Sequence, residues 1–211
     1  MSKLYEQLGI AKSTCIDMYK TMLLARKLDE RMWLLNRAGK IPFVISCQGQ
    51  EAAQIGAAFA FDTTKDYVAP YYRDLGVVLH FGMTPREVML NAFAKAEDPN
   101  SGGRQMPAHF GQRKNRVLSG SSPVATQIPH IVGVALAGKI QKRDFVCLTT
   151  LGEGSTNQGD FHEGLNFAGV HQLPVITMVE NNRYAISVPI EKQLGCAKVS
   201  DRAAAYGMYG A

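Results

Sequence analysis

The stretch that decides the fold is Phe145-Val-Cys-Leu-Thr-Thr-Leu-Gly-Glu-Gly154, followed one helical segment later by Val175-Ile-Thr-Met-Val-Glu-Asn-Asn-Arg183. Each part opens with a short apolar and β-branched run, which is typical of a buried strand, and ends in glycines or asparagines. Between them, Phe161, Leu165 and Ala168 recur at the spacing of one helix face. A helical connection of this length joins parallel strands, so the pattern predicts an α/β fold built on a parallel sheet.

Oxygen-bearing side chains follow both predicted strands. Glu153 stands in a glycine-rich loop after the first strand, and Asn182 follows the second. Ligands of open α/β sheets bind beyond the carboxyl ends of the strands. Carboxylate and amide oxygens suit Mg²⁺, and glycines let backbone N–H groups approach a phosphate. Either half alone is explained as well by a plain turn or strand end, whereas the pair favours a magnesium-bridged diphosphate site.

Several motifs together resemble one protein family. They are Gly152-Glu-Gly-Ser-Thr-Asn-Gln-Gly-Asp160, Glu180-Asn-Asn-Arg-Tyr-Ala-Ile-Ser187, Pro70-Tyr-Tyr-Arg-Asp-Leu-Gly76, Gly103-Arg-Gln-Met-Pro107 and Ser121-Ser-Pro-Val-Ala-Thr-Gln-Ile-Pro129. The chain resembles the alpha subunits of thiamine diphosphate-dependent 2-oxo acid dehydrogenases from about Thr14 to about Met208. The residues of these motifs, above all Gly103 to Pro107, are most similar to those of the branched-chain (2-oxoisovalerate) branch of the family.

The resemblance implies a thiamine diphosphate-binding fold with helices on both faces of the sheet. It implies oxidative decarboxylation of branched-chain 2-oxo acids such as 3-methyl-2-oxobutanoate, with acyl transfer to lipoyl groups. The implied cofactors are thiamine diphosphate and Mg²⁺. The implied partners are a beta subunit, which completes the site, and a lipoyl transacylase core, with a heterotetramer as the family habit. A pyruvate or acetoin dehydrogenase alpha subunit is the near alternative.

The resemblance also assigns residues. The metal ligands are expected to be Glu153, Asn182 and the backbone carbonyl of Tyr184. The residues expected on the cofactor are Tyr72, Arg73, Ser122, Val124, Gly154 and Ser155. In some relatives the turn before the following helix holds a monovalent cation, and the matching residues here are Ser121, Pro123, Thr126 and Gln127. His109 is the candidate catalytic residue and Phe43 the candidate for the substrate pocket.

For some of these residues a plainer interpretation stays open. Ser122 followed by Pro123 is also what an ordinary helix N-cap looks like, ahead of a helix predicted over Val124 to Lys139. Arg73 beside Asp74 is also a common surface pair. A loop histidine such as His109 is more often solvated than catalytic, and core packing explains Phe43 equally well.

Composition narrows the class of protein. The chain has 211 residues, 46% of them hydrophobic, which is enough for one domain, with an N-terminal helical extension over about 1–40. A net charge of +5 without an aromatic-interleaved basic stripe argues against nucleic-acid binding. No apolar run approaches a membrane span. Four scattered cysteines and an N-terminus without signal-peptide character predict a cytoplasmic protein with reduced thiols. A nucleotide enzyme would need a P-loop or a GxGxxG fingerprint, and the chain has neither.

Capping residues, glycines and prolines elsewhere in the chain predict further helices. Thr14 and Asp17 have capping-box spacing for a long helix that ends near Gly39, and Thr84 with Pro85 marks another helix start. Alpha subunits of the resembled family continue well beyond 211 residues and carry a later loop with a catalytic histidine. The chain is therefore expected to be C-terminally truncated, and a non-catalytic cofactor-binding fragment is the distant alternative.

Overall fold

The computed structural model describes residues 4–211, which group into two compact units. The first unit comprises residues up to 61 together with 73–108, and the second comprises 62–72 together with 109–211. Each unit is therefore assembled from two separate stretches of chain. The prediction of one domain, with an N-terminal helical extension over about 1–40, stays a prediction.

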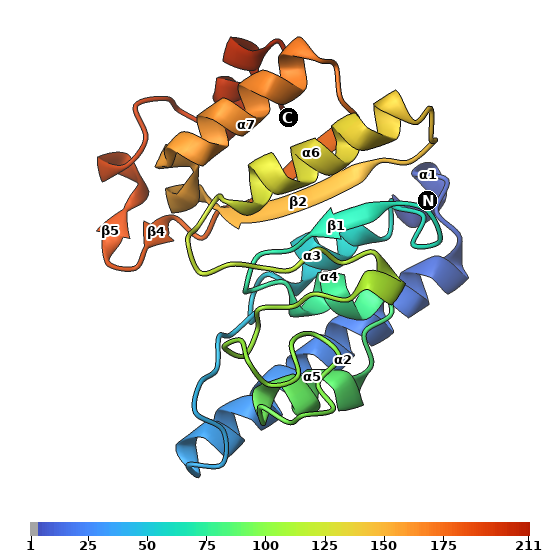
Figure 1. Ribbon diagram of the computed structural model, residues 1–211, viewed down its shortest axis with the longest axis vertical. Helices are drawn as coiled ribbons and strands as arrows, with labels where there is room; N and C mark the ends of the chain where they lie inside the picture. The colour runs from blue at the N-terminus through green and yellow to red at the C-terminus, as the bar shows by residue number, and fades with distance from the viewer. Residues whose placement is uncertain (1–3) are drawn as a thin grey trace. The chain divides into compact units, whose positions relative to one another are not determined.

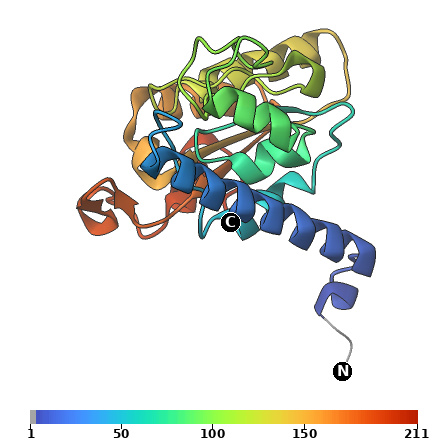
Figure 2. The same cartoon turned by 90° about the horizontal axis from the view of Figure 1, so that it is seen from below.

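The first unit is helical (Figures 1 and 2). Its helices are α1 (Leu4–Gln7), α2 (Lys12–Arg37), α3 (Glu51–Ala58), α4 (Leu75–His80) and α5 (Pro85–Ala92). Thr84 caps α5 in the predicted way, with a full capping box to Glu87 and Pro85 in the first turn. Gly39 ends α2 with φ +66°, and the amide of Lys40 donates to the carbonyl of Leu35, which is the predicted glycine stop.

The predicted start of α2 is wrong. The helix begins at Lys12, two residues before the expected cap Thr14, and its N-cap Ala11 has no side chain that could bond an amide. Asp17, the other half of the expected capping box, instead pairs with Lys20 one turn later at 3.1 Å. Asp17 thus lies inside the helix and forms an ordinary i,i+3 ion pair there, so its spacing from Thr14 does not mark the helix start.

The second unit holds the sheet. Its regular elements are β1 (Tyr67–Ala69), α6 (Gln127–Ile140), β2 (Cys147–Gly152), α7 (Gly159–Val170), β3 (Val175–Glu180), β4 (Tyr184–Ala185) and β5 (Val188–Pro189). Its 3₁₀ helices are η1 (Arg113–Asn115), η2 (Glu153–Asn157), η3 (Ile190–Lys192) and η4 (Val199–Tyr206). Strands β1, β2 and β3 are parallel in that order, which confirms the predicted α/β class.

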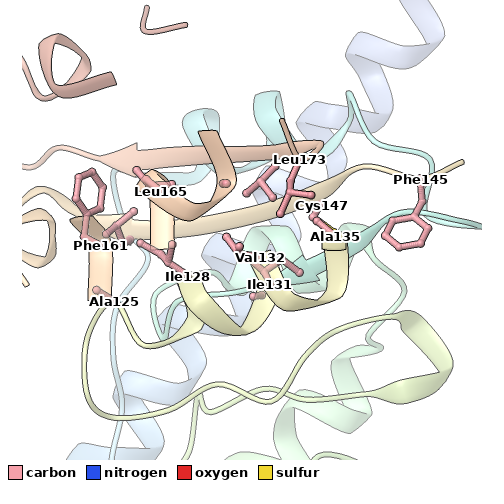
Figure 3. Packing of buried hydrophobic residues seen from close by; sticks show 14 residues of the cluster. Ala125, Ile128, Ile131, Val132, Ala135, Phe145, Cys147, Phe161, Leu165 and Leu173 are labelled. Carbon is pink, nitrogen blue, oxygen red and sulfur yellow. The ribbon is translucent and has the colours of Figure 1, made fainter. Parts of the chain in front are cut away.

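Helices α6 and α7 lie side by side over one face of this sheet (Figures 1 and 3). A side chain at Gly164 of α7 would place its Cβ 2.8 Å from Cγ2 of Ile128, so the glycine permits the close approach of the two helices. The core beneath them includes Ile131, Leu151 and Leu165, all buried. Each large apolar side chain buried in this way contributes about 1.5–3 kcal/mol.

Strand β2 is buried at Cys147 through Leu151, on both of its faces, as its continuous apolar run predicts. Within this unit α6 and α7 account for one face only, so helices on both faces of the sheet stay a prediction. No helix among residues 4–211 is long and apolar enough to cross a membrane.

Candidate functional site

The carboxyl ends of β2 and β3 meet at one edge of the sheet, where Gly152 is aligned with Glu180. The loop after β2 is η2, which begins at Glu153, and the loop after β3 carries Asn181 and Asn182 before the β4–β5 hairpin. Strand β4 packs directly against η2. The structure therefore brings the two predicted halves of the site together, as the parallel pairing requires.

The carboxylate of Glu153 is the least satisfied group in this loop. The residue is 1% exposed, and its Oε1 atom has no hydrogen-bond partner among the described residues. A buried carboxylate without a partner is costly, so it is kept where a cation can compensate it. Glu153 thus has the burial and the vacant oxygen that a metal ligand needs.

Gly154 has to be glycine for the loop to close against the hairpin. A Cβ there would lie 2.5 Å from Cβ of Ala185 and 3.0 Å from Oε1 of Gln193. The next residue, Ser155, is buried, and its hydroxyl lies 3.3 Å from that of Tyr71. Tyr71 in turn donates to the hydroxyl of Tyr72 at 2.6 Å, so the structure joins Tyr72 to the loop through Tyr71.

Two Asx turns shape the segment after β3. The amide of Arg183 donates to Oδ1 of Asn181 at 3.0 Å, and the amide of Tyr184 donates to Oδ1 of Asn182 at 2.9 Å. Arg183 has φ +68°, which the turn imposes on a residue that is not glycine. Oδ1 of Asn182 keeps a second lone pair, because an amide oxygen can accept two bonds.

The hairpin leaves the backbone carbonyl of Tyr184 pointing away from its partner strand. Residues 184 and 189 are aligned, as are 185 and 188, while the amide of Ile190 donates to the carbonyl of Arg183. Hydrogen-bonded and non-hydrogen-bonded pairs alternate along an antiparallel ladder, so Tyr184 occupies a non-hydrogen-bonded position. Its carbonyl oxygen is therefore not used by the hairpin, which suits the predicted backbone ligand.

Ser122 does not cap a helix, and this part of the prediction is wrong. Helix α6 starts at Gln127 and not at Val124, because Ala125 has φ +72°, which no right-handed helix allows. The hydroxyl of Ser122 instead lies 2.8 Å from Nε2 of His109. His109 is 6% exposed, so it is not the solvated loop histidine of the plainer interpretation.

The residues expected to hold a monovalent cation have protein partners. Ser121 donates to the carbonyl of Pro123 at 3.2 Å, and Thr126 donates to Asp160 at 3.0 Å. The side-chain amide of Gln127 donates to the carbonyl of Thr150 at 2.8 Å, which ties the start of α6 to β2. Ser121, Thr126 and Gln127 act as donors in these bonds, and the carbonyl of Pro123, which accepts one of them, has a second lone pair. A cation would use acceptor oxygens, so the cation stays a prediction.

Phe43 and Arg73 lie in the first unit, and the structure does not place them relative to the Glu153 loop. Within their own unit, Nη1 of Arg73 reaches the carbonyl of Ser46 at 3.5 Å, and its carbonyl accepts from Gln54 at 2.9 Å. Val124 lies half-buried just before the strained Ala125. The assignment of these three residues to substrate or cofactor stays a prediction.

Sequence reasoning missed Arg202. It lies in η4, and its guanidinium bonds both Thr156 and Asn157 of the loop after β2. Its neighbours in the sequence form no motif or helical period that would have singled it out.

Comparison with known proteins adds an independent line of evidence. Residues 19–211 match the family model described as "Dehydrogenase E1 component". The chain is 68% identical over 206 residues to the 2-oxoisovalerate dehydrogenase subunit alpha of Bacillus subtilis, covering 98% of this chain and 62% of that protein. It is 37% identical to the pyruvate dehydrogenase E1 component subunit alpha of Bacillus cereus, covering 92% of this chain and 49% of that protein.

Two further matches are more distant. A mitochondrial 2-oxoisovalerate dehydrogenase subunit alpha of Arabidopsis thaliana is 36% identical, covering 94% of this chain and 42% of its own length. A solved thiamin diphosphate-dependent enzyme from Mycobacterium smegmatis superposes with a TM-score of 0.46 at 18% identity, covering 74% of this chain and 25% of that one. The chain thus spans about four-tenths to six-tenths of the length of these curated relatives. Because the family model matches nearly the whole chain, the chain belongs to the dehydrogenase E1 component family.

Proposed function

We propose that this chain is the part of a 2-oxo acid dehydrogenase alpha subunit that holds Mg²⁺ and the diphosphate of thiamine diphosphate. The observation that carries the proposal is the buried carboxylate of Glu153, whose Oε1 atom lacks a partner beside the β4 hairpin. Glu153, Asn182 and the carbonyl of Tyr184 are the metal ligands. Three hard oxygens leave room for diphosphate oxygens and water in the octahedral shell that Mg²⁺ prefers.

Gly154 and Ser155 are proposed to face the diphosphate. The absence of a side chain at Gly154 lets the loop backbone approach it, and the hydroxyl chain from Ser155 through Tyr71 to Tyr72 offers further donors. His109 and Ser122, which are hydrogen-bonded to each other, are proposed on the substrate side of the cofactor. A monovalent cation near Ser121, Pro123, Thr126 and Gln127 would stiffen the turn ahead of α6.

Bound thiamine diphosphate supplies an electron sink for the decarboxylation of a 2-oxo acid. The residues of this chain contribute by orienting the diphosphate and by compensating its charge through the metal. We propose a beta subunit as the partner that completes the site, a heterotetramer as the assembly, and a lipoyl transacylase as the acyl acceptor.

Branched-chain 2-oxo acids are the proposed substrates. The support is the 68% identity to a 2-oxoisovalerate dehydrogenase subunit, against 37% to a pyruvate dehydrogenase subunit. Pyruvate is the second candidate. An assay of the chain with a beta subunit and a lipoyl acceptor, comparing 3-methyl-2-oxobutanoate with pyruvate, decides between them by the ratio of kcat/KM values.

Calorimetry tests the cofactor site. We expect thiamine diphosphate to bind only when Mg²⁺ is present, and we expect Glu153→Gln and Asn182→Ala each to weaken binding on the order of 100-fold. Glu163→Gln, an exposed glutamate of α7 in the same unit, is the matched control and should leave binding unchanged. Binding that is equally tight without Mg²⁺, or in Glu153→Gln, would refute the proposed site.

A further inference from the structure

The 3₁₀ helix η4 packs against α7 and reaches the Glu153 loop. A side chain at Gly169 of α7 would collide with the backbone carbonyl of Tyr206, so the glycine lets η4 lie directly on the helix. Tyr206 is also hydrogen-bonded through its hydroxyl to Nδ1 of His162 on α7. These contacts fix η4 on the same α7 whose N-terminal end follows η2.

From η4, Arg202 extends its guanidinium over the loop. Nη1 donates to Oγ1 of Thr156 at 2.9 Å and also to the backbone carbonyl of Thr156, while Nη2 donates to Oδ1 of Asn157 at 2.8 Å. Thr156 is fully buried and Arg202 half-buried, so the two bonds to Thr156 are partly shielded from solvent, whereas the bond to Asn157 is exposed. A planar fork that makes several bonds at once restrains its acceptors in orientation as well as distance.

The restraint continues to Glu153. The hydroxyl of Thr156 accepts a bond from Arg202 and donates its own proton to the backbone carbonyl of Glu153 at 2.6 Å. A hydroxyl can do both at once, so one polar chain runs from Arg202 through Thr156 to the residue whose carboxylate has the unpartnered oxygen. None of the bonds that Arg202 makes goes to the carboxylate itself, which stays available.

We infer that Arg202 is a positioning residue that holds the η2 loop in the conformation that presents Glu153 to a divalent cation. The inference deepens the proposed function and rests on it for the identity of the ligand, whereas the restraint on the loop stands by itself. Groups that orient a metal ligand from behind alter metal affinity about 10–100-fold when they are removed. Arg202 therefore sets the Mg²⁺ concentration at which the site fills.

The variants are Arg202→Ala, Arg202→Lys and the control Tyr206→Phe. The control removes the bond between Tyr206 and His162, so it loosens η4 without touching the loop. Arg202→Lys keeps the charge, but one ammonium group cannot span Thr156 and Asn157 together. All three are made in the full chain and compared by hydrogen exchange and by calorimetry.

Hydrogen exchange is measured first on the chain without ligands. We expect at least about tenfold faster exchange of the amides from 153 to 158 in Arg202→Ala, a smaller increase in Arg202→Lys, and no change there in Tyr206→Phe. Exchange within α7 should stay as in the parent chain for both Arg202 variants. Unchanged loop exchange in Arg202→Ala overturns the inference, and so does an equal acceleration in Tyr206→Phe, since packing of η4 would then explain it.

The second measurement is the Mg²⁺ concentration at half-maximal binding of thiamine diphosphate. We expect this midpoint to rise about tenfold or more in Arg202→Ala and to stay unchanged in Tyr206→Phe. An unchanged midpoint in Arg202→Ala overturns the inference. If the parent chain binds no thiamine diphosphate at any Mg²⁺ concentration, the proposed function fails, and the exchange measurement alone decides whether Arg202 holds the loop.

Discussion

Two loops of the molecule each bury a carboxylate, and they treat it in opposite ways. Asp98, in the first unit, is 4% exposed, and Glu153, in the second, is 1% exposed, so burial does not distinguish them. Asp98 accepts bonds from Asn91, from both nitrogens of Asn100, and from the amides of Ser101 and Gly103. Oε1 of Glu153 accepts none.

The difference separates a carboxylate that organises its own loop from one that, under the proposed function, is available to a ligand. Asp98 organises the turn over 98–103, and its bonds lower its pKa although burial alone would raise it. The Oε1 atom of Glu153 accepts no such bonds, and a buried carboxylate oxygen without a partner destabilises the fold. Under the proposed function, a bound cation compensates this cost.

Asp98→Asn tests the comparison with the largest expected effect. An amide nitrogen in place of one carboxylate oxygen would face donors, so buried groups would lose their partner, and we expect destabilisation of about 3 kcal/mol. Asp17→Asn, at an exposed i,i+3 pair on α2, is the control and should change stability by less than about 0.5 kcal/mol. Denaturant unfolding measures both. Equal effects in the two variants would mean that the bonds to Asp98 carry no net stability.

Because the pKa of Asp98 is lowered, the difference in unfolding free energy between the parent chain and Asp98→Asn should depend on pH. An aspartate whose folded pKa lies below its unfolded value of about 3.9 adds stability above that value and loses it as the pH falls through the folded pKa. The difference in unfolding free energy between the parent chain and Asp98→Asn should be constant from pH 7 to pH 5 and should narrow from about pH 4 downward. A difference in unfolding free energy that widens in acid would contradict a lowered pKa of Asp98 in the folded chain.

The sequence predicted the secondary-structure elements better than it predicted the contacts between their side chains. Strands β2 and β3 and helix α7 were predicted where they occur, because burial leaves continuous apolar runs in the strands and an apolar face at helical spacing in α7. Glu153 and Asn182 were correctly placed just after β2 and β3, because glycines and asparagines after a strand are themselves a pattern. The start of α6 was missed because Ala125 adopts φ +72° without any glycine or asparagine to announce it.

No comparable sequence pattern marks the polar contacts between residues that are far apart in the chain. Arg202 bonds residues 45 and 46 positions earlier, and nothing periodic connects η4 to η2. His109 and Ser122 are likewise joined by folding and not by spacing. Sequence patterns report what repeats along one element, whereas these contacts depend on where separate elements meet.

Gly154→Ala tests whether the Glu153 loop is as tightly fixed as its contacts indicate. The added Cβ would lie 2.5 Å from Cβ of Ala185, so the hairpin or the loop has to shift, and we expect a loss of about 2 kcal/mol in unfolding free energy. Gly133→Ala, in the middle of α6 with open space around its Cβ, is the control and should gain about 0.5–1 kcal/mol. If Gly154→Ala left the unfolding free energy unchanged or raised it as Gly133→Ala does, the Glu153 loop would be free to adapt.

Glu153→Gln is the smallest change and the sharpest test of the comparison. In the chain without ligands it replaces a buried carboxylate, whose Oε1 atom has no partner, with a neutral amide, so we expect stability to stay level or to rise by about 1 kcal/mol, opposite in sign to Asp98→Asn. Thermal unfolding without Mg²⁺ measures the sign, with the exposed Glu163→Gln as the control. When Mg²⁺ and thiamine diphosphate are present, the parent chain should be more stable than Glu153→Gln, because a ligand that binds only the folded parent chain stabilises it by mass action. If Glu153→Gln is less stable than the parent chain in the absence of ligand, the carboxylate of Glu153 stabilises the fold as that of Asp98 does. The two loops would then not differ in the way proposed.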